Sequence, residues 1–177
     1  AETREEKESL IFQLLDRFRS VMFRQTMFAE FEDEAHTLAE KGEPLTKELL
    51  CEVYGRIGKD YYGDAIEHDF AISCEWARIP HFYRAFYVYK YATGITAAIN
   101  IAHRILTEGE PAVKDYFKFL SSGSSSDPVS LLRLAGVDLE TKAPFEFAMN
   151  EFSETLAEFE KLMNCLLYTS DAADDKA

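Results

Sequence analysis

The residues best suited to chemistry lie in one short stretch of the chain, from residue 79 to residue 94. It holds four of the nine tyrosines and one of the four histidines, His81. Tyr83, Tyr87 and Tyr91 are spaced by four, so on a helix they share one face, with His81 one short turn before them. A row of phenols headed by an imidazole can donate hydrogen bonds to a carbonyl oxygen, or to the oxyanion that it becomes.

A plain aromatic core helix is the competing interpretation, and composition alone favours it. Aromatic residues are mediocre helix formers, however, and buried phenols need hydrogen-bond partners. Tyr89 is expected roughly opposite the shared face, with Phe86 between the two.

The other histidines offer weaker candidates. His36 follows Glu32 by four residues and is expected to form a solvated pair with it on an acidic helix. His68 and His103 have no partner that the sequence identifies. The sequence contains no HExxH motif, no phosphate-binding glycine loop and no GxSxG motif, so the residues alone indicate no complete catalytic site.

Composition narrows the class of protein. The 177 residues are 47% hydrophobic and carry a net charge of −13, which disfavours nucleic acid and anionic membrane surfaces as partners. There is no long apolar run and no start typical of a signal peptide. Cys51, Cys74 and Cys165 are odd in number without CxxC spacing, so neither a disulfide framework nor a zinc knuckle is indicated. The expected compartment is the reducing cytoplasm.

Helical periodicity runs through almost the whole chain and positions these candidates. The fold class it predicts is all-α, because no segment alternates as a strand does. Close packing by a neighbour is expected at Gly55 and Gly58 in the second helix. Start and stop signals predict helices over residues 3–41, 46–62, 69–77, 81–106, 110–120, 128–135 and from about 145 to 163.

Several separated sequence motifs resemble those of one family, and they follow one another in the same order as in that family. They are the runs at residues 23–32, 42–46, 76–83, 87–94, 119–128 and 134–138. Together they make the chain, from about Leu10 to Met163, similar to oligoendopeptidase F, a zinc oligopeptidase of the thimet oligopeptidase-like group.

The resemblance implies a mostly helical, clam-like body with a deep channel. The family's zinc is held by the two histidines of HExxH and a glutamate on the next helix, elements that precede the region represented here. Residues 1–164 would be the C-terminal part of the catalytic domain, and the missing N-terminal part its partner. Zinc is expected in the full-length parent and none in this fragment, which is expected to be inactive alone.

The resemblance also implies roles for individual residues. His81, Tyr87 and Tyr91 would contact a short peptide substrate and its tetrahedral intermediate, and Tyr83 and Tyr89 would line the substrate wall. Which tyrosine meets the oxyanion stays open. Arg78 is expected to lock its turn to an acidic helix rather than to bind substrate.

Two questions remain open from sequence. A non-catalytic all-α module that binds a peptide or partner helix is the alternative function, and a simple structural bundle is a third. Residues 165–177 abandon the helical pattern and resemble a translated sequencing-library adapter, with a frayed acidic C-terminus as the alternative.

Overall fold

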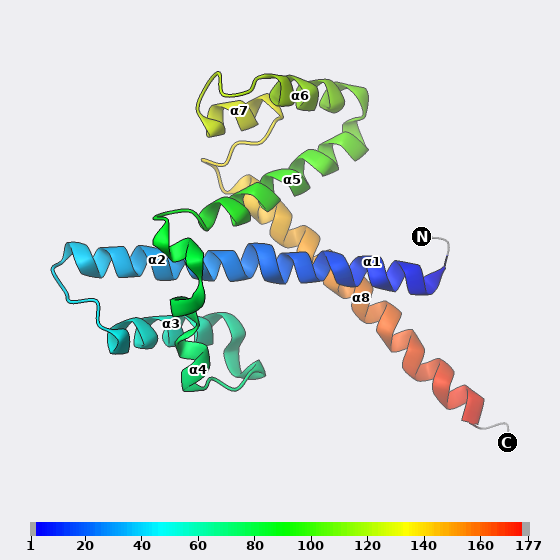
Figure 1. The fold of residues 1–177 in the computed structure, drawn as a ribbon. Helices are drawn as coiled ribbons and strands as arrows, with labels where there is room; N and C mark the ends of the chain where they lie inside the picture. The colour runs from blue at the N-terminus through cyan, green and yellow to red at the C-terminus, as the bar shows by residue number, and fades with distance from the viewer. Residues whose placement is uncertain (1–2, 175–177) are drawn as a thin grey trace. The chain divides into compact units, whose positions relative to one another are not determined.

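The computed structural model describes the backbone of residues 3–174 and the side chains of residues 3–163. Within that range every regular element is a helix, which confirms the all-α class (Figure 1). The α-helices are α1 (Arg4–Arg17), α2 (Arg24–Glu40), α3 (Lys47–Tyr62), α4 (Phe70–Ser73), α5 (Tyr89–Glu108), α6 (Glu110–Ser121), α7 (Pro128–Leu134) and α8 (Ala143–Asp174). None of the helices among the described residues is long and apolar enough to cross a membrane.

The chain forms two compact units. One consists of residues 20–94, and we call it the tyrosine unit because it holds the candidate site. The other combines residues 1–19 with residues 95–177, and we call it the terminal unit.

The predicted helix over residues 3–41 is confirmed, with one unexpected feature. Thr3 caps its start, and a π-helical turn, η1 (Phe18–Phe23), lies between α1 and α2. The chain turns away after Lys41, where Gly42 adopts a φ of +82°. A π turn holds one more residue per turn than an α-helix, and the heptad-like pattern gives no sign of it.

The core of the tyrosine unit lies between α2 and α3. Its buried side chains come from both helices and from Val88, which is fully buried. Thr46 begins α3 as predicted, since its hydroxyl accepts a hydrogen bond of 3.3 Å from the Leu49 N–H. The buried set is Met27, Phe28, Phe31, Val53, Tyr54, Ile57 and Val88.

The two glycines of α3 differ in how closely a neighbouring segment approaches them. A Cβ at Gly55 would lie 2.7 Å from the hydroxyl of Ser73 in α4, so the expected close approach is present there. At Gly58 nothing lies within 4 Å of the added atom, so the same expectation is wrong for Gly58.

The predicted helix over residues 81–106 begins later than expected. Residues 80–83 form a short 3-10 helix, η4 (Pro80–Tyr83), and α5 begins only at Tyr89. Phe86 has a φ of +57°, which ends any continuous helix through this stretch. The predicted helix over 69–77 is likewise short, because α4 gives way to a second 3-10 turn, η3 (Glu75–Arg78).

In the terminal unit, α1 packs against α8. The rings of Phe18 and Phe152 are 5.3 Å apart, and Lys7 forms an ion pair of 2.6 Å with Glu158. The backbone of α8 continues as a helix to Asp174, past the change of pattern at Cys165. The side chains of that segment lie outside the described residues, so the interpretation of residues 165–177 stays a prediction.

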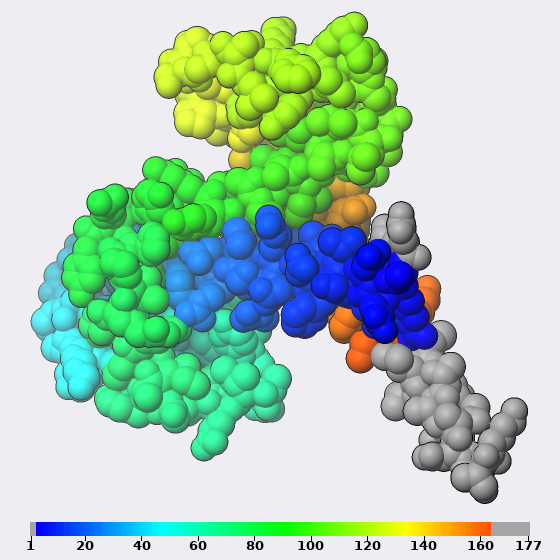
Figure 2. Space-filling model, turned by 45° about the vertical axis from the view of Figure 1, so that its right-hand side comes forward, coloured from blue at the N-terminus to red at the C-terminus, as the bar shows by residue number. Residues whose placement is uncertain are grey.

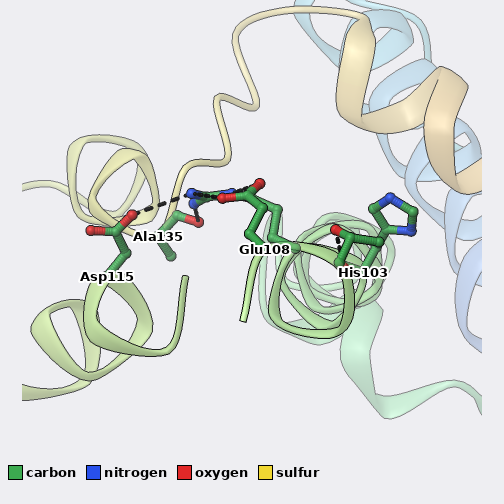
Figure 3. A network of polar contacts seen from close by, with 6 residues as sticks. His103, Glu108, Asp115 and Ala135 are labelled. Carbon is green, nitrogen blue, oxygen red and sulfur yellow. Dashed lines mark hydrogen bonds and ion pairs between the residues drawn. The ribbon is translucent and has the colours of Figure 1, made fainter. Parts of the chain in front are cut away.

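In the rest of the terminal unit, Arg104 of α5 forms a network of polar contacts (Figure 3). Its guanidinium donates to Glu108 at 2.8 and 2.9 Å, to Asp115 of α6 at 3.2 Å, and to the Ala135 carbonyl after α7 at 2.5 Å. Gly136, with a φ of +80°, makes room for it, since a Cβ there would lie 1.8 Å from the guanidinium. One side chain therefore links three segments.

Candidate active site

His81, Tyr87 and Tyr91 form one cluster. Their ring centroids are separated by 5.6 Å (His81–Tyr87), 5.8 Å (His81–Tyr91) and 5.6 Å (Tyr87–Tyr91). Nε2 of His81 lies 3.2 Å from the Tyr91 hydroxyl. The three residues come from η4, from the irregular stretch before α5, and from α5 itself. They meet through the turn of the chain, not through the helical spacing of four from which their proximity was predicted.

One phenol of the cluster has a shifted pKa. The hydrogen bond with Tyr87 raises the pKa of Tyr91 above its ordinary value. The ammonium of Lys90 lies 5.3 Å from the centre of the Tyr87 ring, a cation–π distance. At neutral pH the Tyr91 hydroxyl is therefore a neutral hydrogen-bond donor.

Tyr83 and Tyr89 lie outside this cluster. Tyr83 is 77% exposed, and its hydroxyl donates at 3.4 Å to the carbonyl of Ala77. Tyr89 is the first residue of α5 and is exposed, and its carbonyl accepts a hydrogen bond from Thr93. Among the described residues no ring contact joins either tyrosine to the cluster, so three of the five predicted site residues are brought together.

A buried carboxylate sets the position of this stretch. Glu32 of α2 is 4% exposed, and its Oε1 accepts a hydrogen bond of 2.7 Å from the backbone N–H of Phe86. The ring of Phe86 packs on the imidazole of His36, with centroids 4.5 Å apart. The prediction that Glu32 and His36 form a solvated pair is therefore wrong, because both face the 80–88 segment.

The spacing of Glu32 held a signal that could have indicated its burial. It follows Phe28 by four residues and Phe31 by one, so it lies on the buried face of α2. Buried carboxylates are rare unless they have a partner, and here the partner is a backbone N–H.

A second carboxylate fixes the start of the same segment. Glu75 accepts hydrogen bonds from Arg24 at 2.6 Å and from the buried Tyr54 at 2.7 Å, and also from Arg78. Burial opposes ionisation of Glu75, but these hydrogen bonds outweigh it and hold its pKa below the ordinary value. Burial and the contact with Glu75 raise the pKa of Tyr54. The expectation that Arg78 locks its turn to an acidic helix is wrong, because its partner, Glu75, lies in its own turn.

A mostly apolar cavity of about 250 Å³ lies beside these residues. Glu32, His36, Trp76 and Tyr83 contribute to its wall, together with the rings of Phe31 and Phe82. In Figure 2 the green segment that carries residues 76–83 lies against the cyan end of α2, in agreement with the 5.1 Å contact between the Phe31 and Phe82 rings.

The two remaining histidines have structural neighbours. Nε2 of His68 lies 2.7 Å from the Gly63 carbonyl after α3, and the His103 ring lies 4.5 Å from that of Phe147. In Figure 3 the His103 imidazole points away from the Arg104 network. Over the side chains that the structure describes, no three histidine, cysteine, aspartate or glutamate residues gather as a metal site would require.

Comparisons with known proteins agree with this architecture. Residues 1–151 match the model of peptidase family M3. The chain is 50% identical over 161 residues to oligopeptidase PepF of Bacillus subtilis, covering 90% of this chain and 24% of that protein. It is 41% identical over 164 residues to the plasmid-encoded oligoendopeptidase F of Lactococcus lactis subsp. cremoris, covering 92% and 27%.

A solved structure is similar as well. The crystal structure of oligoendopeptidase-F from Enterococcus faecium superimposes with a TM-score of 0.89 at 42% identity, over 93% of this chain and 32% of that one. The chain belongs to peptidase family M3. It spans about a quarter of the length of the curated relatives it matches.

Proposed function

We propose that the complete protein is a zinc-dependent oligopeptidase that hydrolyses short peptides, and that this chain supplies the wall that stabilises the reacting carbonyl. The observation that carries the proposal is the cluster of His81, Tyr87 and Tyr91 in a chain of peptidase family M3. Three side chains from three consecutive segments converge there.

The chemistry required of the cluster is hydrogen-bond donation. When water adds to a peptide carbonyl, negative charge develops on the oxygen, and a preorganised O–H donor stabilises that charge. Tyr91 suits this role because a phenol carries its proton at neutral pH, and the hydrogen bond with Tyr87 raises its pKa further. In the resting arrangement the phenol is engaged with Tyr87 and His81, so substrate must replace one of these partners.

His81 is proposed as both a positioning and a donor residue. If Nε2 carries the proton, it donates to the Tyr91 oxygen, and the Tyr91 O–H is then directed to Tyr87 or to the substrate. Such a chain of donors strengthens each successive hydrogen bond. The exposed Tyr83 and Tyr89 are proposed to contact the peptide outside the cluster.

Zinc is assigned to no residue of this chain, because the resemblance to oligoendopeptidase F places the two HExxH histidines and the glutamate ligand before the region represented here. The isolated chain is accordingly expected to bind no zinc stoichiometrically and to cleave no peptide. Metal analysis that found one tightly held zinc per chain would contradict this assignment.

The test of the donor role uses the complete protein and the variants Tyr87→Phe and Tyr91→Phe. Tyr61→Phe is the matched control, because its hydroxyl donates to Glu30 and has no proposed role in the site. Loss of one oxyanion donor commonly costs about two orders of magnitude in turnover. We expect kcat to fall in at least one cluster variant with little change in KM, and to change little in the control. Unchanged kinetics in both cluster variants would reject the role.

A further inference from the structure

Two cysteines far apart in sequence lie in contact. Sγ of Cys51 in α3 is 3.0 Å from Sγ of Cys74, the residue that ends α4. Both are free thiols; Cys51 is buried and Cys74 is half-buried. Closing a disulfide would require the two sulfurs to approach by about 1 Å.

A glycine in α3, Gly55, makes this contact possible. Gly55 lies one helical turn after Cys51, and Ser73 directly precedes Cys74. The missing side chain at Gly55 lets the end of α4 approach α3, because a Cβ there would lie 2.7 Å from the Ser73 hydroxyl and 3.4 Å from its Cβ. Glu75, the next residue, fixes the segment on its other side through Arg24 and Tyr54.

We propose that Cys51 and Cys74 are a site of reversible oxidative modification, at which they form an intramolecular disulfide that cross-links α3 to the segment leading to His81. The inference goes beyond the proposed peptidase function and does not depend on it. Disulfides in a reducing compartment are typically transient and redox-sensing, which suits a pair that is held close while reduced.

The oxidant is the disulfide form of a small thiol, such as oxidised glutathione. The thiolate of Cys74, the more accessible of the two, attacks one sulfur of that disulfide and releases one glutathione thiolate. Cys51 loses its proton to solvent and its thiolate attacks the Cys74 sulfur of the mixed disulfide, which releases the second glutathione. Two cysteine thiols are thus oxidised while one glutathione disulfide is reduced to two glutathione molecules.

The Cys51 contact raises the pKa of the Cys74 thiol. This slows the first step, because only the thiolate attacks. Once the mixed disulfide forms, the neighbouring sulfur makes closure fast. We therefore expect the intramolecular disulfide, and not a glutathione adduct, to accumulate.

The test uses the full chain with Cys165→Ser, so that only two thiols remain. After treatment of the dilute native protein with oxidised glutathione, we expect both titratable thiols to disappear and the mass to fall by two hydrogens. Digestion with trypsin should yield residues 48–56 joined to residues 60–78, and dithiothreitol should separate them. Two persistent thiols, a stable glutathione adduct on one cysteine, or cross-links only between chains would overturn the proposal.

Matched glycine variants test how the pair is positioned. Gly55→Ala is expected to slow disulfide formation, because the new methyl group meets Ser73. Gly58→Ala in the same helix meets nothing within 4 Å and is expected to leave the rate unchanged. Circular dichroism confirms that both variants are folded before the rates are compared. Equal slowing by both would overturn the role of Gly55.

Discussion

The carboxylate of Glu32 accepts a hydrogen bond of 2.7 Å from the backbone N–H of Phe86, a residue 54 positions further along the chain. This contact holds Phe86 at a φ of +57°, a conformation that a bulky residue adopts only when its surroundings impose it. Tyr87 follows directly, so α2 determines where the site tyrosine stands.

Replacing Glu32 tests this coupling. Glu32→Ala leaves the Phe86 N–H without its partner, and we expect a loss of about 1–3 kcal/mol in the free energy of unfolding. Glu32→Gln keeps an acceptor oxygen and is expected to cost less. Urea denaturation followed by circular dichroism measures both, and equal costs would show that the hydrogen bond to Phe86 is not what Glu32 contributes.

Tyr54→Phe removes one donor from the half-buried Glu75. Arg24 and Arg78 remain, so the carboxylate keeps two partners. We expect the free energy of unfolding, measured by urea denaturation, to fall by about 1–2 kcal/mol. Tyr61→Phe is the matched control, since its hydroxyl donates at 3.1 Å to Glu30, whose carboxylate is exposed. A control that proves as costly as Tyr54→Phe would contradict the importance of the Glu75 contacts.

The stability of the fold should fall at acid pH as Glu75 becomes protonated. Its pKa is lower in the folded chain than in the unfolded one, so its stabilising contribution is complete above the ordinary glutamate value of 4.5. The contribution is lost as the pH falls through the lower, folded pKa. Thermal melts between neutral and acid pH should show a steeper decline for the parent chain than for Glu75→Gln, and parallel declines would contradict the prediction.

Gly136→Ala should be among the most damaging changes in the terminal unit. The substitution combines a positive φ with a Cβ placed 1.8 Å from the Arg104 guanidinium. We expect the free energy of unfolding to fall by more than about 2 kcal/mol. Gly109→Ala has a φ of +70° but nothing within 4 Å, so it isolates the backbone cost, about 1–3 kcal/mol, and Gly136→Ala is expected to lose more than this control. Urea denaturation compares the two, and similar losses would show that Arg104 moves aside freely.

The sequence predicted much of the fold because local signals determine helix ends. Thr46 and Asp127 begin their helices through side-chain caps, and the Asp127 carboxylate accepts the Ser130 N–H at 2.9 Å. These interactions are encoded within a few residues, so they can be found without knowledge of the fold.

The site was predictable only in part, and for a physical reason. The motifs of residues 76–94 indicated His81, Tyr87 and Tyr91, and the structure brings these three together. Only Tyr91 lies on the helix predicted for all three, because the chain breaks at Phe86, whose backbone N–H donates to Glu32 in another helix. Local periodicity contains no trace of a contact across 54 residues.

The chain has a single tryptophan, Trp76, and it belongs to the tyrosine unit, where its ring lies 6.2 Å from Phe31 in the cavity wall. Its indole nitrogen is buried and has no hydrogen-bond partner among the described residues. When the protein is excited at the long-wavelength edge of its absorption band, the fluorescence comes from Trp76. The emission therefore reports on the tyrosine unit alone. Comparing the emission transition with the far-ultraviolet transition, to which every helix contributes, separates the melting of the two units in a single unlabelled sample.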